Sequence, residues 1–378
     1  MSDPVYLDHN ATTPLAPEVL DAMLPYLRDH FGNPSSGHVY GARARAAVLR
    51  AREQVAALLG AAPDEVIFTS GGTEANNLAI RGVAEARSDR KRIVTTVIEH
   101  PATARPCDWL ALRGRSVVRL GVDPSGTTCV DAARQAIDGQ TALVTVMHSN
   151  NETGVLQPIA EIAALAKAVG ATVHTDAAQS LGKVPVNVDA LAVDLVSIAG
   201  HKLYAPKGVG ALYVRRGTPL APFALGASHE GGLRPGTENV ASVVGLGVAC
   251  ELMGRDIDEA AASMRRLRDA LWARLAAEVP GLLRNGHAER CLPNTLSVRF
   301  PGVAGDAVLA GAPSVAASTG SACHDGHDVA SQVILAMGVE AQAALGSVRL
   351  TLGRGTSPDD VAEAGIALVR SWRALAPT

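Results

Sequence analysis

The sequence ALVTVMHSNNETG at residues 142–154 joins a short apolar run to a dense group of polar residues. The same arrangement returns in ATVHTDAAQ at residues 171–179 and in DLVSIAGHK at residues 194–202. A strand that is covered on both faces reads as a continuous apolar run. These stretches therefore predict buried parallel strands that each end in polar side chains.

Further β-rich runs alternate with helical stretches between residues 64 and 215. They lie at residues 65–69, 92–97, 116–120 and 209–214. This alternation predicts an α/β fold in which helices cover both faces of a mainly parallel sheet. Ligands of such folds bind beyond the carboxyl ends of the strands, so the site is expected there.

The pattern changes after a long helical stretch at residues 241–279. Short β runs follow at residues 295–300, 314–317 and 347–352, and a last helix is expected to begin with Ser357 as its N-cap. We therefore predict a large domain over residues 15–255. A smaller α+β domain is predicted over residues 256–378, together with the N-terminal segment 1–14.

The composition excludes several classes of protein. The 378 residues include 34 Lys+Arg and 37 Asp+Glu, a net charge of −3, without a basic block, so neither nucleic acid nor an anionic membrane is an expected partner. The longest apolar stretch, residues 241–250, is too short for a bilayer, which needs about 20 residues. The N-terminus lacks a signal-like segment, and the five cysteines are scattered without a CxxC pair. A cytoplasmic protein is expected.

The polar residues after the strands suggest a shared site. The turn at residues 69–74 offers backbone N–H groups to an anion, although a plain helix N-cap explains it equally well. His100 follows one strand, and Asp176 and Gln179 follow another. A lone histidine is more often structural, and an acid at this position is more often a helix cap. Lys202 ends the sixth run, where an apolar core favours a lowered pKa and Schiff-base chemistry.

Taken together, these groups match the requirements of pyridoxal phosphate. This cofactor needs a helix terminus for its phosphate, a carboxylate for its pyridine nitrogen and a lysine for its aldehyde. Each signal is weak alone, but their convergence on one edge of one sheet predicts a pyridoxal-phosphate site.

The chain resembles the cysteine desulfurases, a branch of the fold-type I pyridoxal-phosphate enzymes, over nearly its whole length. The matching segments are residues 6–8 (YLD), 10–14 (NATTP), 31–36 (FGNPSS), 68–80 (FTSGGTEANNLAI), 150–154 (NNETG), 176–180 (DAAQS), 200–202 (GHK), 234–239 (RPGTEN) and 320–323 (GSAC). So many ordered motifs make the resemblance specific.

The resemblance implies a role for each residue that faces the cofactor ring. Lys202 corresponds to the Schiff-base lysine and Asp176 to the partner of the pyridinium nitrogen. Gln179 corresponds to the donor to the phenolic oxygen. His100 is expected to stack on the ring and to manage protons, and Asn151 is expected beside it.

The resemblance also implies how the phosphate is held. Gly72 and Thr73 in the strand-to-helix turn are expected to bind it together with His201. Thr237 is expected to reach the same phosphate from a second subunit, which implies a homodimer.

The same resemblance implies which residues bind the substrate and which residue takes the sulfur. Arg349, with Asn33 nearby, is expected to bind the substrate carboxylate, a planar bidentate task that suits arginine. Cys323 corresponds to the nucleophile that takes the sulfur as a persulfide, and small neighbours suggest that it lies on a loop of the smaller domain. His324 and His327 are candidates to lower the pKa of that thiol.

The sequence departs from the family pattern at two places. Some members carry a serine three residues before the lysine as a phosphate ligand, where this chain has Ala199. The stretch CHDGHD at residues 323–328 is closer to selenocysteine lyases, as is the stretch at residues 234–237. No metal site is expected at Cys323, because an adjacent cysteine and histidine do not readily chelate one tetrahedral ion.

The predicted function is conversion of L-cysteine to L-alanine, with transfer of sulfur to Cys323 for delivery to an acceptor. Iron-sulfur scaffolds, sulfur-carrier proteins, tRNA thiolation and DNA phosphorothioation all draw on similar enzymes. One alternative is a selenocysteine lyase that releases alanine and selenium. Another is a cofactor-binding scaffold without turnover, which the intact set of His100, Asp176, Lys202 and Cys323 disfavours.

Overall fold

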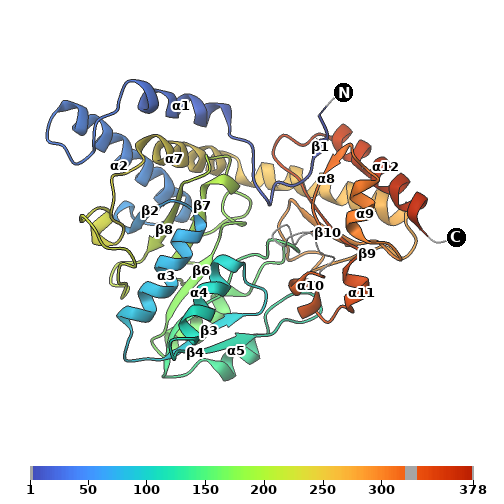
Figure 1. The fold of residues 1–378 in the computed structure, drawn as a ribbon, viewed down its shortest axis with the longest axis horizontal. Coiled ribbons are helices and arrows are strands. Elements are labelled where there is room, and N and C mark those ends of the chain that lie inside the picture. Colours follow the sequence, from blue (N-terminus) through green and yellow to red (C-terminus); the bar gives the residue numbers. More distant parts are fainter. Residues whose placement is uncertain (1–2, 320–329, 377–378) are drawn as a thin grey trace.

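A computed structural model describes residues 3–319 and 330–376. Its main sheet has seven strands in the order β2-β8-β7-β6-β5-β3-β4, and only β8 runs antiparallel to its neighbours (Figure 1). The strands are β2 (Val66–Thr69), β3 (Arg92–Thr96), β4 (Ser116–Leu120), β5 (Thr141–Thr145), β6 (Thr172–Asp176), β7 (Leu195–Ala199) and β8 (Gly210–Val214). The predicted mainly parallel sheet is confirmed.

Helices cover both faces of this sheet, as the continuous apolar runs predicted. Ile67 packs with the helices α3 (Gly72–Ala86) and α4 (Pro101–Ala111) on one face. Its neighbours Val66 and Phe68 point to the other face. That second face is covered by the helices α1 (Pro17–Arg28), α2 (Val39–Leu59), α5 (Val130–Ala136), α6 (Ile159–Ala168) and α7 (Val240–Arg255). Successive side chains of β2 therefore enter two separate cores, which favours apolar residues at these three positions.

A second hydrophobic cluster joins the C-terminal elements to the start of the chain. Its sheet, in the order β12-β10-β9, packs beside the short parallel pair of β1 and β11. The strands are β1 (Val5–Tyr6), β9 (Leu283–Arg284), β10 (Thr295–Arg299), β11 (Val315–Ala316) and β12 (Ser347–Thr351), and the helices are α8 (Ile257–Glu278), α9 (Gly305–Ala310) and α12 (Pro358–Leu375). The domain boundary near residue 255 stays a prediction.

Three details of this region refine the expectations from sequence. The helical stretch at residues 241–279 is two helices, because the backbone at Asp256 leaves the helical conformation. Ser357 caps α12 as predicted: its hydroxyl accepts a hydrogen bond from the Asp360 N–H at 3.1 Å, and the Asp360 carboxylate accepts one from the Ser357 N–H at 2.8 Å. The strands β1 and β9 have two residues each and leave no pattern in the sequence.

Two short helices after the undescribed stretch of residues 320–329 return to the main sheet. They are α10 (Gln332–Ala336) and α11 (Ala341–Ala344), and they pack against Ile98 and Met147 at the ends of β3 and β5. In the part of the chain that the structure describes, no helix has the length and apolar character needed to cross a membrane.

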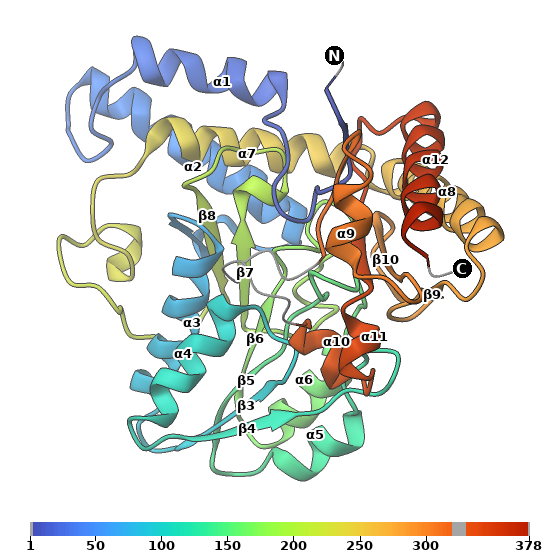
Figure 2. The ribbon, with the colours of Figure 1, turned by 45° about the vertical axis from the view of Figure 1, so that its right-hand side comes forward.

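The segment between β8 and α7 projects from the body of the molecule (Figure 2). It is tied back by Glu230, a buried residue whose carboxylate lies 2.6 Å from the Arg52 guanidinium and accepts a hydrogen bond from the Phe68 N–H at 2.8 Å. The guanidinium also lies over the Phe68 ring. This contact fixes the segment that carries Thr237 to the edge of the main sheet.

We expect Glu230→Ala to lower the free energy of unfolding by about 3 kcal/mol, because it leaves the Arg52 guanidinium, whose side chain is only 15% exposed, and the buried Phe68 N–H without their partner. Urea denaturation measures this change. The matched control is Asp64→Ala, which removes a surface carboxylate from the exposed pair with Arg216 and is expected to leave the free energy of unfolding nearly unchanged. Equal effects of the two substitutions would contradict the anchoring role of Glu230.

Candidate active site

Asp176 is the last residue of β6 and lies buried at the carboxyl edge of the main sheet. One carboxylate oxygen accepts a hydrogen bond from the Asn76 side chain of α3 at 2.7 Å. The other accepts one from the N–H of Ala178 at 2.9 Å. The Asp176 side chain therefore caps the turn that follows β6, which is the structural role that the sequence also allowed. Its hydrogen bond to Asn76 holds it against α3.

Lys202 follows β7 in a single turn of 3₁₀ helix. Its ammonium nitrogen donates to the carbonyl oxygens of Asn10 and Ala11 at 2.5 and 2.6 Å. The side-chain N–H of Gln179 donates to the same Asn10 oxygen at 3.0 Å. The N-terminal segment thus crosses the edge of the sheet and brings Lys202 and Gln179 to one backbone carbonyl.

His100 is the N-cap of α4, and its Nδ1 accepts a hydrogen bond from the N–H of Ala102 at 3.1 Å. Burial lowers the pKa of His100; the charge of Asp176 opposes this effect and that of Lys202 adds to it. His100, Asp176 and Lys202 are therefore close enough to act electrostatically on one another. The occupied Nδ1 leaves the proton of the neutral ring on Nε2.

The glycine turn supplies the beginning of α3, where the first backbone N–H groups have no partner within the helix. Gly72 and Thr73 lie in this first turn. His201 lies after β7, where its Nδ1 contacts the Thr12 hydroxyl at 3.2 Å and burial lowers its pKa to about 4. A Cβ atom placed on Gly72 would lie 3.2 Å from the Cβ of Ala199, so Ala199 lies beside this turn. A serine at position 199 would bring its hydroxyl to the same turn.

Arg349 in β12 is 4% exposed and is held by the N-terminal segment. Its guanidinium donates to the Asp8 carboxylate at 2.7 Å and to the Asn151 carbonyl at 3.0 Å. Its Nε is buried and has no hydrogen-bond partner among the residues described. Its backbone N–H donates to Ser318 at 2.7 Å, so the chain that leads toward residue 320 begins beside Arg349.

Two predicted residues are not joined to these groups by hydrogen bonds among the described residues. Asn33 is exposed in the turn between α1 and α2, where its side chain accepts from the N–H of Ser35 at 2.9 Å. Thr237 is also exposed, although Arg234 in the same segment pairs with Glu74 of α3 at 2.9 Å. Cys323, His324 and His327 lie outside the described residues.

Three residues of the site were not identified from sequence: Asn10, Lys183 and Glu99. Asn10 and Lys183 join the segments around Lys202. Glu99 is buried beside His100, and burial raises the pKa of its carboxyl group to about 8. The sequence pattern does not indicate that Lys183 or Glu99 belongs to the site, because a charged residue after a strand usually lies on the surface.

The described residues fit pyridoxal phosphate. A buried carboxylate, a lysine, a neutral imidazole and a helix N-terminus meet at one sheet edge, which is the donor set that this cofactor needs. Asn76 keeps an unpartnered buried Oδ1 beside the Asp176 carboxylate. Among residues 3–319 and 330–376, no three His, Cys, Asp or Glu side chains are grouped so as to hold a metal ion.

Comparisons with known proteins find similar proteins over nearly the whole chain. The family model "Aminotransferase class-V" matches residues 5–363. A cysteine desulfurase of Trichormus azollae is 45% identical over 378 residues, which covers 99% of this chain and 94% of the relative. A solved structure described as a NifS-like protein has a TM-score of 0.91 at 35% identity and covers 98% of this chain and 99% of its own. Another, described as SspA in complex with cysteine, has a TM-score of 0.83 at 37% identity and covers 92% and 98%.

Proposed function

The chain belongs to the class-V aminotransferase family and, within it, to the cysteine desulfurases, which are pyridoxal-phosphate-dependent enzymes. On this basis we propose a role for each of its site residues. Lys202 binds the cofactor, and Asp176 faces its pyridine nitrogen. Gln179 and Asn151 lie beside its ring, and His100 stacks on it.

The phosphate group of the cofactor is proposed to bind at the beginning of α3. Gly72 and Thr73 offer backbone N–H groups and a hydroxyl there, and His201 offers a neutral imidazole. When bound, pyridoxal phosphate withdraws electrons from the α-carbon of the substrate.

We assign the handling of the substrate to four side chains. Arg349 binds the substrate carboxylate, and Asn33, which is exposed in the turn between α1 and α2, is assigned to the same group. Lys202 takes the α-proton, because the Asn10 and Ala11 carbonyls keep its nitrogen at the sheet edge. The Cys323 thiolate attacks the substrate sulfur: the carbon–sulfur bond breaks, a sulfur–sulfur bond forms, and the carbon keeps the electron pair and takes a proton. L-cysteine and the Cys323 thiol thus give L-alanine and a Cys323 persulfide.

One observation carries this proposal: residues 8–11 connect the two functional groups. Asp8 fixes Arg349, and Asn10 and Ala11 fix Lys202. A single short segment thereby sets the position of the group that binds the carboxylate relative to the group that takes the proton. This is the arrangement that an enzyme acting at the α-carbon of an amino acid requires.

We expect Arg349→Lys to raise the KM for L-cysteine by about 10–100-fold, because a lysine cannot reproduce two charge-assisted hydrogen bonds to a carboxylate. Steady-state alanine release measures the change. Arg373→Lys, on the exposed side of α12, is the matched control and is expected to leave KM unchanged. An unchanged KM in Arg349→Lys would overturn the assignment.

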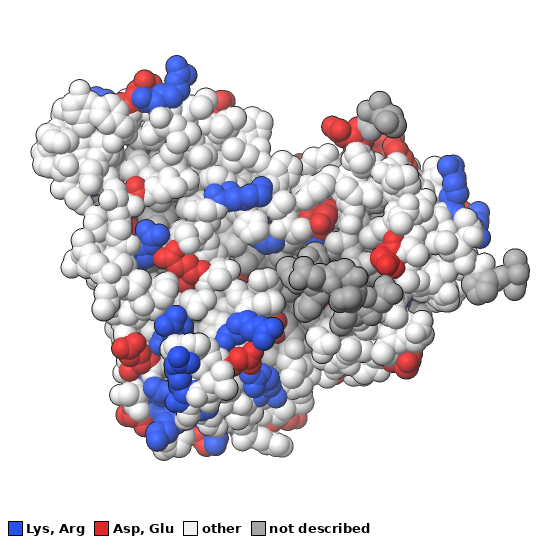
Figure 3. Space-filling model, in the orientation of Figure 1, with Lys and Arg blue, Asp and Glu red and all other residues white. Residues whose placement is uncertain are grey.

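A homodimer is proposed from an exposed apolar surface around the turn between α1 and α2. Phe31 is 76% exposed and Val39 is 67% exposed, and the Phe31 ring stacks on the ring of Tyr40. Charged side chains are sparse at this edge, at the upper left of Figure 3. A second copy of the chain would cover this surface. The second subunit would also bring its own Thr237 to the phosphate site.

We expect Phe31→Asp to weaken the dimer by about 2 kcal/mol or more, because it places a charge in the apolar contact. Light scattering over a concentration series measures the shift toward monomer. Leu112→Asp is the matched control, since Leu112 is 85% exposed at the end of α4 and lies away from this turn. A wild-type protein that is monomeric at all concentrations would refute the proposal.

The persulfide is proposed to pass to a protein acceptor, an iron-sulfur scaffold or a sulfur carrier, in the cytoplasm. The cysteines that the structure describes support a reducing compartment, because all of them are free thiols. They are Cys107, Cys129, Cys250 and Cys291.

A further inference from the structure

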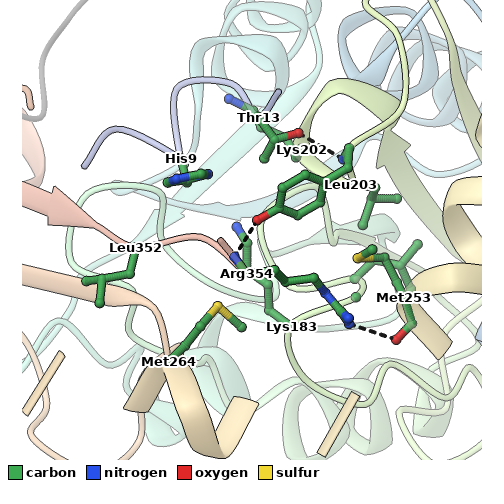
Figure 4. A pocket seen from close by; sticks show the side chains of 12 residues that line it. His9, Thr13, Lys183, Lys202, Leu203, Met253, Met264, Leu352 and Arg354 are labelled. Atoms are coloured by element: carbon green, nitrogen blue, oxygen red, sulfur yellow. Dashed lines mark hydrogen bonds between the residues drawn. The ribbon is translucent and has the colours of Figure 1, made fainter. Parts of the chain in front are cut away.

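Lys183 is a second lysine at the centre of the site and has no role in the mechanism above. It follows β6, four residues after Gln179, and is 7% exposed. Its ammonium nitrogen donates to the Asn10 side-chain oxygen and to the Gln179 side-chain oxygen, both at 3.2 Å. Lys183 and Lys202 line the same small, partly open cavity of about 10 Å³, which has room for about one water molecule (Figure 4).

The two hydrogen bonds determine how both amides are oriented. A lysine ammonium only donates, so it selects the oxygen of each amide and turns the NH₂ group away. The NH₂ group of Asn10 then donates to the Thr295 hydroxyl at 3.0 Å, and that of Gln179 donates to the Asn10 carbonyl at 3.0 Å. The Asn10 carbonyl also accepts a hydrogen bond from Lys202. By orienting the Asn10 and Gln179 amides, Lys183 therefore fixes the groups that surround Lys202.

The charged and titratable groups around Lys183 are basic. Lys202 and Arg349 act on it electrostatically, it acts in turn on His9, and Arg354 lines the cavity (Figure 4). No carboxylate of residues 3–319 or 330–376 lies within ion-pair distance of Lys183.

The two lysines therefore influence each other's protonation. Burial, with the charges of Lys202 and Arg349 acting in the same direction, lowers the pKa of Lys183 to about 7. The repulsion between the two ammonium groups is mutual.

We propose that Lys183 is a positioning residue of the active site: it holds the Asn10 and Gln179 amides in the orientation that Lys202 requires, and while it is protonated its positive charge lowers the proton affinity of the Lys202 nitrogen. This inference rests on the proposed role of Lys202 as the lysine that binds pyridoxal phosphate. Its consequence is that Lys202 is neutral, and able to take a proton, at a lower pH than an isolated lysine.

The test is a pH titration of the visible absorbance of bound pyridoxal phosphate in the holoenzyme. The wild type is compared with Lys183→Met, which keeps the length of the side chain without its charge, and with Lys183→Arg, which keeps the charge. Lys183→Gln is a second neutral variant that keeps a hydrogen-bond donor. Lys91→Met is the matched control, because Lys91 is an exposed lysine just before β3.

We expect the titration midpoint to rise by about one pH unit in both neutral variants, which is the scale of a neighbouring charge at several ångströms. Lys183→Arg and Lys91→Met are expected to titrate like the wild type. If neither neutral variant holds the cofactor while Lys183→Arg does, the need for the charge is also supported. Midpoints in Lys183→Met or Lys183→Gln that equal the wild-type value would overturn the proposal, as would loss of the cofactor from Lys183→Arg.

Failure of the underlying function has a different signature. If Lys202 does not bind the cofactor, Lys202→Ala keeps the wild-type spectrum whatever stands at position 183. A normal spectrum that depends on Lys202, with no effect of Lys183, would refute only the inference about Lys183.

Discussion

Lys202→Ala is expected to lack the visible absorbance that pyridoxal phosphate acquires when it is bound to a lysine. The carbonyl oxygens of Asn10 and Ala11 hold the Lys202 nitrogen, whereas the nitrogen of the neighbouring Lys183 is bound to the side chains of Asn10 and Gln179 instead. Alanine release is expected to fall by at least about 10²–10⁴-fold, the usual contribution of a general base. Absorbance spectra and alanine assays on the purified variant measure both effects.

The matched control for this variant is Lys207→Ala. Lys207 is an exposed lysine five positions further along the chain. This variant should keep both the absorbance and the activity. A Lys202→Ala protein with an unchanged spectrum would show that another amine binds the cofactor and would contradict the assigned chemistry of the site.

Cys323→Ser is expected to abolish turnover of L-cysteine, because a serine hydroxyl is not ionised at neutral pH and forms no persulfide. Cofactor binding should persist, since the groups assigned to the cofactor lie on the main sheet and α3. Mass spectrometry after incubation with L-cysteine should find one added sulfur on the wild-type peptide that contains Cys323.

Cys129→Ser is the control for this experiment, because Cys129 is an exposed free thiol at the start of α5. It should keep full activity. Added sulfur on Cys129, or on another cysteine in place of Cys323, would refute the assignment of the nucleophile.

The main sheet was predictable because its strands are buried on both faces. Ile67 enters one core while Val66 and Phe68 enter the other, so three successive positions of this strand are apolar. Residues at the carboxyl ends of such strands share one edge, and this brought Asp176 and Lys202 to one place. A topological rule was sufficient to find them.

The supporting residues could not be found in this way. The Asp8 carboxylate and the Arg349 guanidinium are 341 positions apart in sequence, and only the assembled fold brings them into contact. Lys183 and Glu99 are charged residue types in buried positions, and a sequence pattern assigns such residues to the surface. The strand β1 forms by pairing with the distant β11, and β9 pairs with the next strand, β10; with two residues each, neither has a periodicity of its own.

The central claim is that this enzyme moves sulfur from L-cysteine to Cys323. The most direct test measures alanine production from L-cysteine and from L-selenocysteine, side by side, by the wild type and by Cys323→Ser. The account predicts that the wild type produces alanine from L-cysteine and that Cys323→Ser does not. Alanine from L-selenocysteine alone, with Cys323→Ser as active as the wild type, would contradict it and identify a selenocysteine lyase.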